Sequence, residues 1–562
     1  MGKDYSILIG GEAGEGSRKA GLLIAKLLNR FGYRIFIYDD YQSLIRGGHN
    51  FSKIRASDKK ILSHRKKIDF LLALNKDTIE KHKNDLDQGG MLIYNSDKIN
   101  PHTNDIGVGV KEKGIGIPIE KITKEEGGIP IMKNAALLAG FAKIIGINWK
   151  VVEEVFKKEL TKKTELNLKI AERAYKETKN LININRLNQE PLPLLTGNEA
   201  ISLGAVKAGL DLYIAYPMTP ASSILHYLAA HKEEFNIAVT QFENEISVIN
   251  SAIGAAYAGA RSMVGTSGGG FALMTEALSL AAQSETPILI VESQRAAPAT
   301  GVPTYTAQAD LFFTIGAGHG DLVRFVIAPG DADEALYWAG TALNLSWKYQ
   351  TPSILLVDKE ISESTFSLNK TIVDKVNYEK PLIWNGKGEY KRYKDTKDGV
   401  SPLSFPGQKD VISKGTSYEH DEFGITVEED EKIIEKMQNK RLRKFKKMQE
   451  EVDKFEAVKV YGNQDSKKAI VVWGSTKGPA KEAAEKLGIK MVQPIIIEPF
   501  PEKQMKEALE GVEKLISIET NASGQMEKVL RCFGIKVDNK ILKYTGRPFL
   551  PEEIEEKLKE II

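Results

Sequence analysis

The sequence predicts an α/β fold built from several domains, with a parallel sheet in its central part. Three observations support this prediction: the length of 562 residues, the alternation of short apolar runs with helix-length segments, and the polar or glycine-rich loops that follow those runs. Roughly three or four domains are expected at this length. Apolar runs that alternate with helical segments are typical of parallel β-α-β units.

The composition excludes several classes of protein. The chain is 42% hydrophobic and 27% charged with a formal net charge of +3, so no strong field favours nucleic acid. No apolar run reaches the roughly 18 residues that a membrane-spanning helix needs. The single cysteine, Cys532, excludes a disulfide framework, a zinc site and an all-cysteine iron–sulfur cluster within this chain. Because no export signal is visible either, we expect a cytoplasmic protein.

Residues 1–185 are predicted to form one α/β domain. A strand at Ser6–Gly10 runs into the loop Gly11–Gly16, and a helix and a second strand at Arg34–Tyr38 follow. A phosphate could lie in such a loop against the helix N-terminus. The spacing G-x-x-G-x-G is not the dinucleotide fingerprint, however, and two acids in the loop would repel a pyrophosphate. A nucleotide site and a tight turn that packs helix on strand both remain open.

The segment Tyr41–Asn50 is predicted to be a loop with two glycines beside Arg46 and His49. Glycines allow a ligand or a partner to approach the backbone closely. A lone histidine in a loop is more often solvated than functional, so His49 is expected at the surface. Later in this domain we expect strands at Asp69–Leu74 and Gly90–Tyr94 and helices at Lys133–Ile145, Trp149–Lys158 and Leu166–Thr178.

Residues 186–193 form a polar, proline-punctuated linker, and residues 194–375 are predicted to be the central domain. Four apolar strands in this domain each end in a loop: Leu212–Ala215, Ile237–Thr240, Ser262–Val264 and Ile288–Val291. Because ligands bind outside the carboxyl ends of parallel strands, these loops should meet at one edge as a candidate site. The residues they carry include Thr219, Glu245, the Gly268–Gly270 turn and Arg295.

The residue types in these loops suggest a small carboxylate substrate near a nitrogen heterocycle. Glu245 is expected to open the helix Ser247–Ala260, where a carboxylate gains roughly 0.3–1 kcal/mol, and could share a proton with a ring nitrogen. Glu243, two residues earlier, competes for this role. Because residues two apart face different directions, only one of the two acids can point into the site. Arg295 precedes a loop braced by proline and glycine and suits bidentate carboxylate recognition. Thr219 offers a hydroxyl of fixed direction.

After residue 375 the pattern becomes irregular before it returns to α/β. Residues 376–460 form a polar connector with a charged helical stretch at Glu428–Phe455, whose basic run 440–447 is expected to be a solvated helix face. Residues 461–562 are predicted to form a last α/β domain. Its elements are strands at Lys468–Gly474, Met491–Ile497 and Lys514–Glu519 and helices at Lys477–Lys486 and near Glu502–Gly511.

Longer motifs occur at Tyr216–Pro220 (YPMTP), Gln294–Thr304 (QRAAPATGVPT), Gln308–Leu311, Glu519–Gln525 and Lys543–Phe549. They resemble the alpha chain of the 2-oxoacid:ferredoxin oxidoreductases. The N-terminal glycine-rich loop with Tyr41 and Arg46–Gly48 is similar to that family's gamma domain, fused ahead of the alpha domain. The resemblance covers nearly the whole chain. It implies a gamma-type α/β domain, a thiamine-diphosphate pyrimidine-type parallel-sheet domain and a C-terminal transketolase-C-like α/β domain.

The resemblance also implies an activity of the EC 1.2.7 type. Such enzymes convert a 2-oxoacid (2-oxoglutarate, pyruvate or a branched-chain acid) and CoA into acyl-CoA and CO₂ and reduce ferredoxin. Glu245 would bind N1′ of the thiamine diphosphate aminopyrimidine, and it is preferred to Glu243 because Gly254 follows it by nine residues, as in the family. Arg295 and Thr219 would hold the substrate's carboxylate and carbonyl oxygen. Further cofactor-binding candidates are Gly268 and Gly269 for thiamine diphosphate and Arg46 for CoA.

One half of the thiamine diphosphate site is missing from this sequence. The family binds Mg²⁺ with a Gly-Asp-Gly and a later asparagine, and the nearest imitation, Gly320-Asp321-Leu322 with Asn344, lacks the second glycine. A beta subunit should therefore supply the Mg²⁺–diphosphate motif and the cysteines of a [4Fe-4S] cluster, in an alpha–beta or (alpha–beta)₂ complex. The alternatives are an alpha-type subunit of another thiamine-diphosphate decarboxylase or transferase without ferredoxin, or a non-catalytic paralogue.

Overall fold

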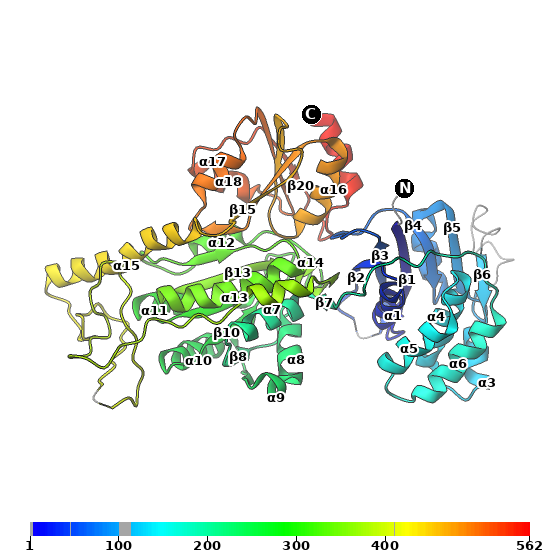
Figure 1. Cartoon of the computed structure of the whole chain (residues 1–562), viewed down its shortest axis with the longest axis horizontal. Coiled ribbons are helices and arrows are strands. Elements are labelled where there is room, and N and C mark those ends of the chain that lie inside the picture. Colours follow the sequence, from blue (N-terminus) through cyan, green and yellow to red (C-terminus); the bar gives the residue numbers. More distant parts are fainter. Residues whose placement is uncertain (1–3, 45, 100–113, 410) are drawn as a thin grey trace. The chain divides into compact units, whose positions relative to one another are not determined.

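A computed structural model describes residues 4–44, 46–99, 114–409 and 411–562. The chain forms two compact units, Met1–Leu195 with Ser364–Asn369 and Thr196–Glu363 with Lys370–Ile562, here called unit 1 and unit 2 (Figure 1). The division into five segments stays a prediction, and residues 364–369, which the sequence placed in the central domain, belong to unit 1. Over the described ranges, no helix combines the length and the apolar character needed to span a membrane.

Unit 1 is built on a mixed sheet. Its strands are β1 (Asp4–Ala13), β2 (Arg34–Asp40), β3 (Gly47–Ser57), β4 (Ile68–Ala73), β5 (Leu86–Asn95), β6 (Gly114–Ile117), β7 (Leu194–Thr196) and β14 (Thr365–Ser367). Its helices are α1 (Ser17–Arg30), α2 (Lys76–His82), α3 (Ile119–Glu125), α4 (Lys133–Ile144), α5 (Trp149–Glu159) and α6 (Thr164–Glu177). The strand order is β6-β5-β4-β1-β3-β2-β14-β7. The apolar faces of α1, α4, α5 and α6 form one core against the sheet.

The segment predicted as a loop at Tyr41–Asn50 differs from the prediction. Its second half begins β3, which pairs antiparallel with both β1 and β2, while Ile45 lies outside the described residues. The prediction that His49 is solvated is wrong, because only 6% of this residue is exposed. Its Nε2 lies 2.9 Å from Nε2 of His82. Burial, followed by the charge of His82, lowers the pKa of His49 to about 4.

The glycine-rich loop Gly11–Gly16 serves as a turn between β1 and α1. The Glu15 carboxylate accepts a hydrogen bond from the backbone N–H of Glu12 at 2.9 Å and pairs with Lys133 at 2.5 Å. Gly16 has φ +80° and precedes the first residue of α1. These contacts favour the turn over the nucleotide site, the two alternatives that the sequence left open.

Unit 2 contains the predicted central sheet. Its strands are β8 (Leu212–Ala215), β9 (Ala238–Gln241), β10 (Ser262–Thr266), β11 (Ile288–Gln294), β12 (Phe325–Ile327), β13 (Pro352–Asp358) and β18 (Ile496–Glu498), and the order is β18-β12-β13-β11-β10-β8-β9. The helices around it are α7 (Gly197–Lys207), α8 (Ser222–Ala230), α9 (Lys232–Phe235), α10 (Glu245–Tyr257), α11 (Gly268–Gln283), α12 (Leu311–Gly316), α13 (Ala332–Tyr349) and α14 (Lys359–Glu363). All neighbouring strands from β12 to β9 are parallel, as predicted.

Both faces of the central sheet are covered by helices. α10 and α11 pack on one face, and α7, α8 and α13 cover the other, where α7 and α13 lie side by side (Figure 1). Parallel sheets need this double cover because their strands are apolar on both faces. The sequence shows the same property, since β11 begins Ile-Leu-Ile-Val without alternation.

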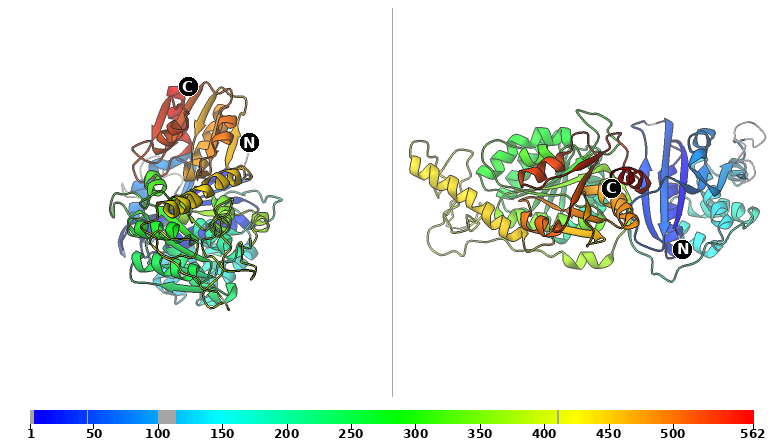
Figure 2. Two further views of the ribbon diagram at one scale, coloured as in Figure 1. Left: turned by 90° about the vertical axis from the view of Figure 1, so that its left-hand side faces the viewer. Right: turned by 90° about the horizontal axis from the view of Figure 1, so that it is seen from above.

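The C-terminal part of unit 2 adds a five-stranded sheet. Its strands are β15 (Val458–Gly462), β16 (Lys468–Val471), β17 (Lys490–Pro494), β19 (Lys514–Glu519) and β20 (Asn539–Leu542), with helices α16 (Lys477–Leu487), α17 (Glu502–Ala508), α18 (Gln525–Cys532) and α19 (Pro551–Ile561). Figure 2 shows these elements, orange to red, as a layer on the green central sheet. The strand predicted at Met491–Ile497 is divided: β17 stays in the C-terminal sheet, and β18 pairs antiparallel with β12 of the central sheet.

The connector ends in the long helix α15 (Glu431–Val452). The prediction that the basic run 440–447 is a solvated face is wrong for its inner side, where Lys440 and Lys444 are buried. Both ammonium groups pair with the buried carboxylate of Glu285. The buried Arg441 pairs with Glu419 in the same way. Acidic partners from distant parts of the chain thus compensate for burying the charges.

Candidate active site

The carboxyl ends of the central strands meet at a topological switch point. From β8 the chain moves outward to the edge strand β9 and then returns to β10 on the other side of β8. In open parallel sheets, the crevice at such a point is where ligands bind. The loops after β8, β9, β10 and β11 reach this edge, and they carry the candidate residues of the central domain.

Glu245 is the buried acid of this edge. It is the first residue of α10, as predicted, and the side chain of Asn244 caps the helix by accepting from the Ser247 N–H. Only 3% of Glu245 is exposed, and its Oε1 has no hydrogen-bond partner within the described ranges of the chain. A buried polar atom without a partner is costly. Glu245 therefore has a free acceptor position that a ligand can fill.

Gly270 makes the position of Glu245 possible. A Cβ built on Gly270 would lie 2.1 Å from Oγ1 of Thr266 and 2.5 Å from Oε1 of Glu245. No side chain fits at those distances, so the glycine lets the acid and the helix approach each other. The predicted turn at Gly268–Gly270 is in fact the first turn of α11, which follows Ser267. Tertiary packing overrides the low helix propensity of the three glycines.

Glu243 does not enter the site. Its side chain is exposed, and its Oε1 accepts a hydrogen bond from the Ser247 hydroxyl at 2.7 Å. This hydrogen bond is the main reason why the pKa of Glu243 is lowered. The geometry thus separates the two acids, one of which is buried at the switch point while the other lies on the surface.

Arg295 and Thr219 come together from different loops. Nη1 of Arg295 donates to the backbone carbonyl of Thr219 at 2.9 Å. Arg295 is half-buried, and this burial lowers the pKa of its guanidinium. The same loop is linked to the glutamate side of the edge, because the Thr266 hydroxyl lies 4.0 Å from the sulfur of Met218. Thr219, Glu245, Arg295 and the α11 glycines therefore share one edge, as predicted from the sequence.

The other cofactor-binding candidates have different surroundings. A Cβ on Gly268 would lie 2.7 Å from a carboxylate oxygen of Asp310, whereas a Cβ on Gly269 would meet nothing within 4 Å. Arg46 is an exposed residue of unit 1. Its assignment to CoA stays a prediction.

Two acids near this edge, the buried Glu292 and the half-buried Asp310, were not predicted. Glu292 on β11 is fully buried, and neither of its carboxylate oxygens has a hydrogen-bond partner among the residues that the structure describes. Burial, followed by the charges of Asp310 and Asp358, raises the pKa of the Glu292 carboxyl well above its usual range. Burial also raises the pKa of Asp310 to about 6. The signal in the sequence was an acid placed directly after the apolar run Ile288–Val291.

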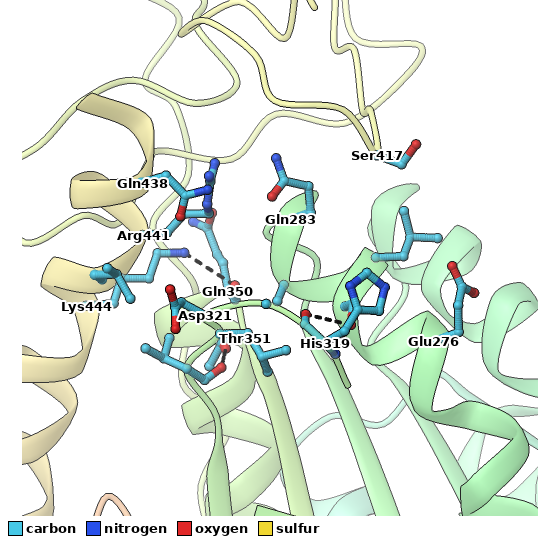
Figure 3. Close-up of a pocket in the computed structure, with 17 residues that line it drawn as sticks. Glu276, Gln283, His319, Asp321, Gln350, Thr351, Ser417, Gln438, Arg441 and Lys444 are labelled. Carbon is cyan, nitrogen blue, oxygen red and sulfur yellow. Dashed lines mark hydrogen bonds between the residues drawn. The ribbon is translucent and has the colours of Figure 1, made fainter. Parts of the chain in front are cut away.

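A pocket at the opposite edge of the central sheet has a different character (Figure 3). It has a volume of about 220 Å³ and is lined by residues before β11 and β13 and by α15, among them Gln283, Asp321, Gln350, Arg441 and Lys444. Its two cations are neutralised by Glu419 and Glu285. The rejected Mg²⁺ candidate Asp321 lies here. Its supposed partner Asn344, on α13, accepts from Arg261 at 2.6 Å instead.

Comparisons with known proteins agree with this arrangement. Residues 203–439 match the thiamine-diphosphate-binding family model of pyruvate flavodoxin/ferredoxin oxidoreductases, residues 6–177 match the pyruvate ferredoxin/flavodoxin oxidoreductase model, and residues 466–554 match core domain II of pyruvate:ferredoxin oxidoreductase. The 2-oxoacid:ferredoxin oxidoreductase subunit alpha of Saccharolobus solfataricus is 33% identical over 99% of this chain and 98% of its own. Subunit alpha of 2-oxoacid:ferredoxin oxidoreductase 2 from Aeropyrum pernix is 32% identical over 100% of this chain and 98% of its own.

A solved structure extends the similarity to the fold. It is the 2-oxoglutarate:ferredoxin oxidoreductase from Magnetococcus marinus with 2-oxoglutarate, coenzyme A and succinyl-CoA bound. The two chains superpose with a TM-score of 0.89 at 31% identity, and 99% of each is covered. The similarity therefore extends over both units.

Proposed function

The chain belongs to the 2-oxoacid:ferredoxin oxidoreductases, and from this membership we propose that the edge with Glu245 and Arg295 is its active site. The protein is a subunit of an enzyme that oxidatively decarboxylates a 2-oxoacid in a CoA-dependent reaction to acyl-CoA and CO₂. Thiamine diphosphate and CoA are the cofactor and co-substrate of this reaction. We also propose roles for Glu245, Arg295 and Thr219 in this reaction.

The buried carboxyl of Glu245 supports this assignment most directly. Its Oε1 has no partner in the described part of the chain and lies beside Gly270. An acceptor in this state fits a ring nitrogen that shares a proton with it, as N1′ of an aminopyrimidine does. When bound, thiamine diphosphate supplies the nucleophilic carbon and the electron sink for decarboxylation. Glu245 would hold the proton at N1′, in surroundings from which water is largely excluded.

Arg295 and Thr219 would bind the substrate. One N–H of the Arg295 guanidinium donates to the Thr219 carbonyl. The other N–H groups of the planar guanidinium remain available to bind a carboxylate. Partial burial strengthens such a pair, because water screens it less. The Thr219 hydroxyl would donate to the substrate's carbonyl oxygen. Gly268 and Gly269 would lie against the cofactor at the first turn of α11.

The remaining parts of the enzyme would come from a partner. Relatives of this chain are named as alpha subunits, so the protein works with at least one other subunit. We propose that a beta subunit supplies the Mg²⁺–diphosphate motif and a [4Fe-4S] cluster, that ferredoxin is the acceptor, and that the complex is alpha–beta or (alpha–beta)₂. The single cysteine supports this division, because one thiolate cannot hold a cluster. It is also consistent with a cytoplasmic location.

An assay of the complex tests the proposed function. The chain is co-expressed with its beta subunit, and the purified complex is given a panel of 2-oxoacids, CoA and a viologen acceptor. We expect CO₂ release and viologen reduction that both require CoA, with a preference for one class of 2-oxoacid. CO₂ release that is independent of CoA and of the acceptor would identify a plain decarboxylase instead.

A further inference from the structure

The loop that carries Arg295 has little support of its own. It closes at its base, where the Ala296 N–H donates to the Tyr305 carbonyl at 3.0 Å and the Val302 N–H donates to the Ala296 carbonyl at 2.8 Å. Residues 297–301, beyond that base, are exposed. The direction of Arg295 therefore depends on what holds the base of the loop.

A loop of the C-terminal sheet domain holds the base from one side. The Thr306 N–H donates to the Gly546 carbonyl at 3.1 Å. Gly546 has φ +76°, and a Cβ there would lie 3.1 Å from Cβ of Tyr305. The next residue, Arg547, places its guanidinium carbon 3.5 Å from the centre of the Tyr305 ring. At this distance the planar cation lies against the ring, which is an attractive arrangement.

Gln308 fixes the far end of the loop. Its backbone N–H donates to the Thr520 carbonyl at 2.8 Å, and its Oε1 accepts from the Thr520 N–H at 3.0 Å. Its Nε2 donates to the Trp473 carbonyl at 2.7 Å. The residue is completely buried. Gln308 thus ties the end of the loop to the interior, and the stack of Arg547 on Tyr305 supports the part next to Arg295.

We propose that Arg547, through its stack on Tyr305, is a positioning residue for Arg295. Tyr305 is hydrogen-bonded to Ala296, the neighbour of Arg295, so a shift of its ring moves the backbone that carries the guanidinium. On the other side Arg295 is held by the Thr219 carbonyl. The C-terminal domain thereby sets the direction in which Arg295 faces its anion. This inference rests on the proposed function in taking that anion to be the carboxylate of the 2-oxoacid.

Kinetics of the co-expressed complex test the proposal with four variants. Arg547→Met keeps an apolar stem without the cation, Arg547→Lys keeps a cation without the flat group, Tyr305→Leu removes the ring, and Tyr305→Phe keeps it. Arg547→Met and Tyr305→Leu should each raise KM for the 2-oxoacid roughly 5- to 30-fold, with kcat and the KM for CoA nearly unchanged. Tyr305→Phe should resemble the wild type, and Arg547→Lys should be intermediate.

Two comparisons separate positioning from other roles. The double variant Arg547→Met/Tyr305→Leu should be no worse than either single variant, because both remove one stack. Arg531→Met is the matched control, since the Arg531 side chain lies 71% exposed on α18 and should leave the kinetics unchanged. A raised KM in Arg547→Met with normal Tyr305→Leu would show that Arg547 binds substrate directly, which overturns the proposal.

A second measurement does not depend on activity. Trypsin can cut after Arg295, because Ala296 follows, but not after Arg547, because Pro548 follows. Cleavage after Arg295, followed by mass spectrometry of the full chain, should be faster in Arg547→Met and Tyr305→Leu and unchanged in Arg531→Met. Unchanged cleavage in both Arg547→Met and Tyr305→Leu would overturn the proposal that the stack positions Arg295. If cleavage accelerates in these variants while even the wild-type complex turns over no 2-oxoacid, the proposed function is wrong but the positioning role of Arg547 is supported.

Discussion

At the scale of single residues, the site depends on which of two neighbouring acids is buried. Sequence reasoning left Glu243 and Glu245 as competitors, and only the family resemblance favoured the second. The structure separates them through the start of α10: Asn244 caps the helix, so Glu245 turns inward while Glu243 stays outside and accepts from Ser247.

The first prediction follows from this separation. Glu245→Gln keeps the shape of the side chain but removes the group that shares a proton with the cofactor ring. The decarboxylation rate of the complex should fall by roughly 10²-fold or more, with an unchanged thermal unfolding midpoint. Glu243→Gln is the matched control and should retain nearly full activity. The assignment is wrong if the two variants show the reverse pattern.

The second prediction concerns the contact between Gly270 and Glu245. In Gly270→Ala the new methyl group would lie within 2.5 Å of both Thr266 Oγ1 and Glu245 Oε1, so the acid must move. Turnover by the complex should fall by at least tenfold, while α11 still forms because alanine favours helices. Gly316→Ala, where nothing lies within 4 Å, should behave as the wild type. Full activity in Gly270→Ala would mean that the position of Glu245 is not critical.

At the scale of elements, α15 is attached to the central sheet by buried charges. Glu285, just before β11, is completely buried between Lys440 and Lys444 of the helix, and Arg392 donates to its backbone carbonyl at 2.7 Å. Burial alone would raise the pKa of Glu285, but Lys440 and Lys444 hold it well below its usual range. Burial lowers the pKa of Lys444 to about 8. This cluster therefore links α15 and the connector to the start of β11.

The third prediction tests that attachment. Glu285→Gln leaves two buried ammonium groups without their counter-ion, which should destabilise the chain by about 3–5 kcal/mol and lower its thermal unfolding midpoint. Glu450→Gln, which removes a solvent-exposed partner of Lys447 on the same helix, should change the midpoint little. The triple variant Glu285→Leu/Lys440→Leu/Lys444→Met should recover most of the loss, because an apolar set needs no compensation. If the triple variant does not recover the unfolding midpoint, the destabilisation in Glu285→Gln has a cause other than the two unpaired ammonium groups.

The elements also show which parts of the fold could be predicted from the sequence. β8 to β11 and α10 were predicted within a few residues, because short apolar runs alternate there with a helix-length segment and polar or glycine-rich loops. β3 was missed, since Gly47, Gly48 and Asn50 have the composition of a turn and the strand forms only by pairing with β1 and β2. β14 and β18 have three residues each, too few for any periodicity. His49 and Lys440 were misjudged because their partners, His82 and Glu285, are distant in sequence. Glu292 was missed because its burial depends on the packing around β11 and not on its sequence neighbours.

At the scale of the whole molecule, the chain carries only part of what the cofactor needs. It offers Glu245 for the pyrimidine ring, but the sequence contains no Gly-Asp-Gly with a following asparagine for Mg²⁺ and diphosphate. One charge-assisted hydrogen bond contributes about 1.5–3 kcal/mol. Millimolar binding already requires about 4.1 kcal/mol.

The fourth prediction follows from this comparison. The chain purified alone should bind thiamine diphosphate negligibly in calorimetry, show no turnover and be colourless. Co-expression with a beta subunit should give a brown complex that binds the cofactor and turns over. The same titration with the Glu245→Gln complex provides the control for the pyrimidine contact. Tight cofactor binding by the lone chain would contradict a shared site.

The pairing of β18 with β12 has a consequence for how the protein is made. Val326 lies opposite Glu498, and Ile327 lies opposite Ile496, so the last strand of the central sheet is synthesised long after the others. Until β18 has been synthesised, the outer edge of β12 has unpaired N–H and C=O groups, which can pair with strands of other nascent chains. Truncation before residue 496 leaves that edge open permanently. An isolated central region is therefore expected to aggregate, however complete its own helices and strands are.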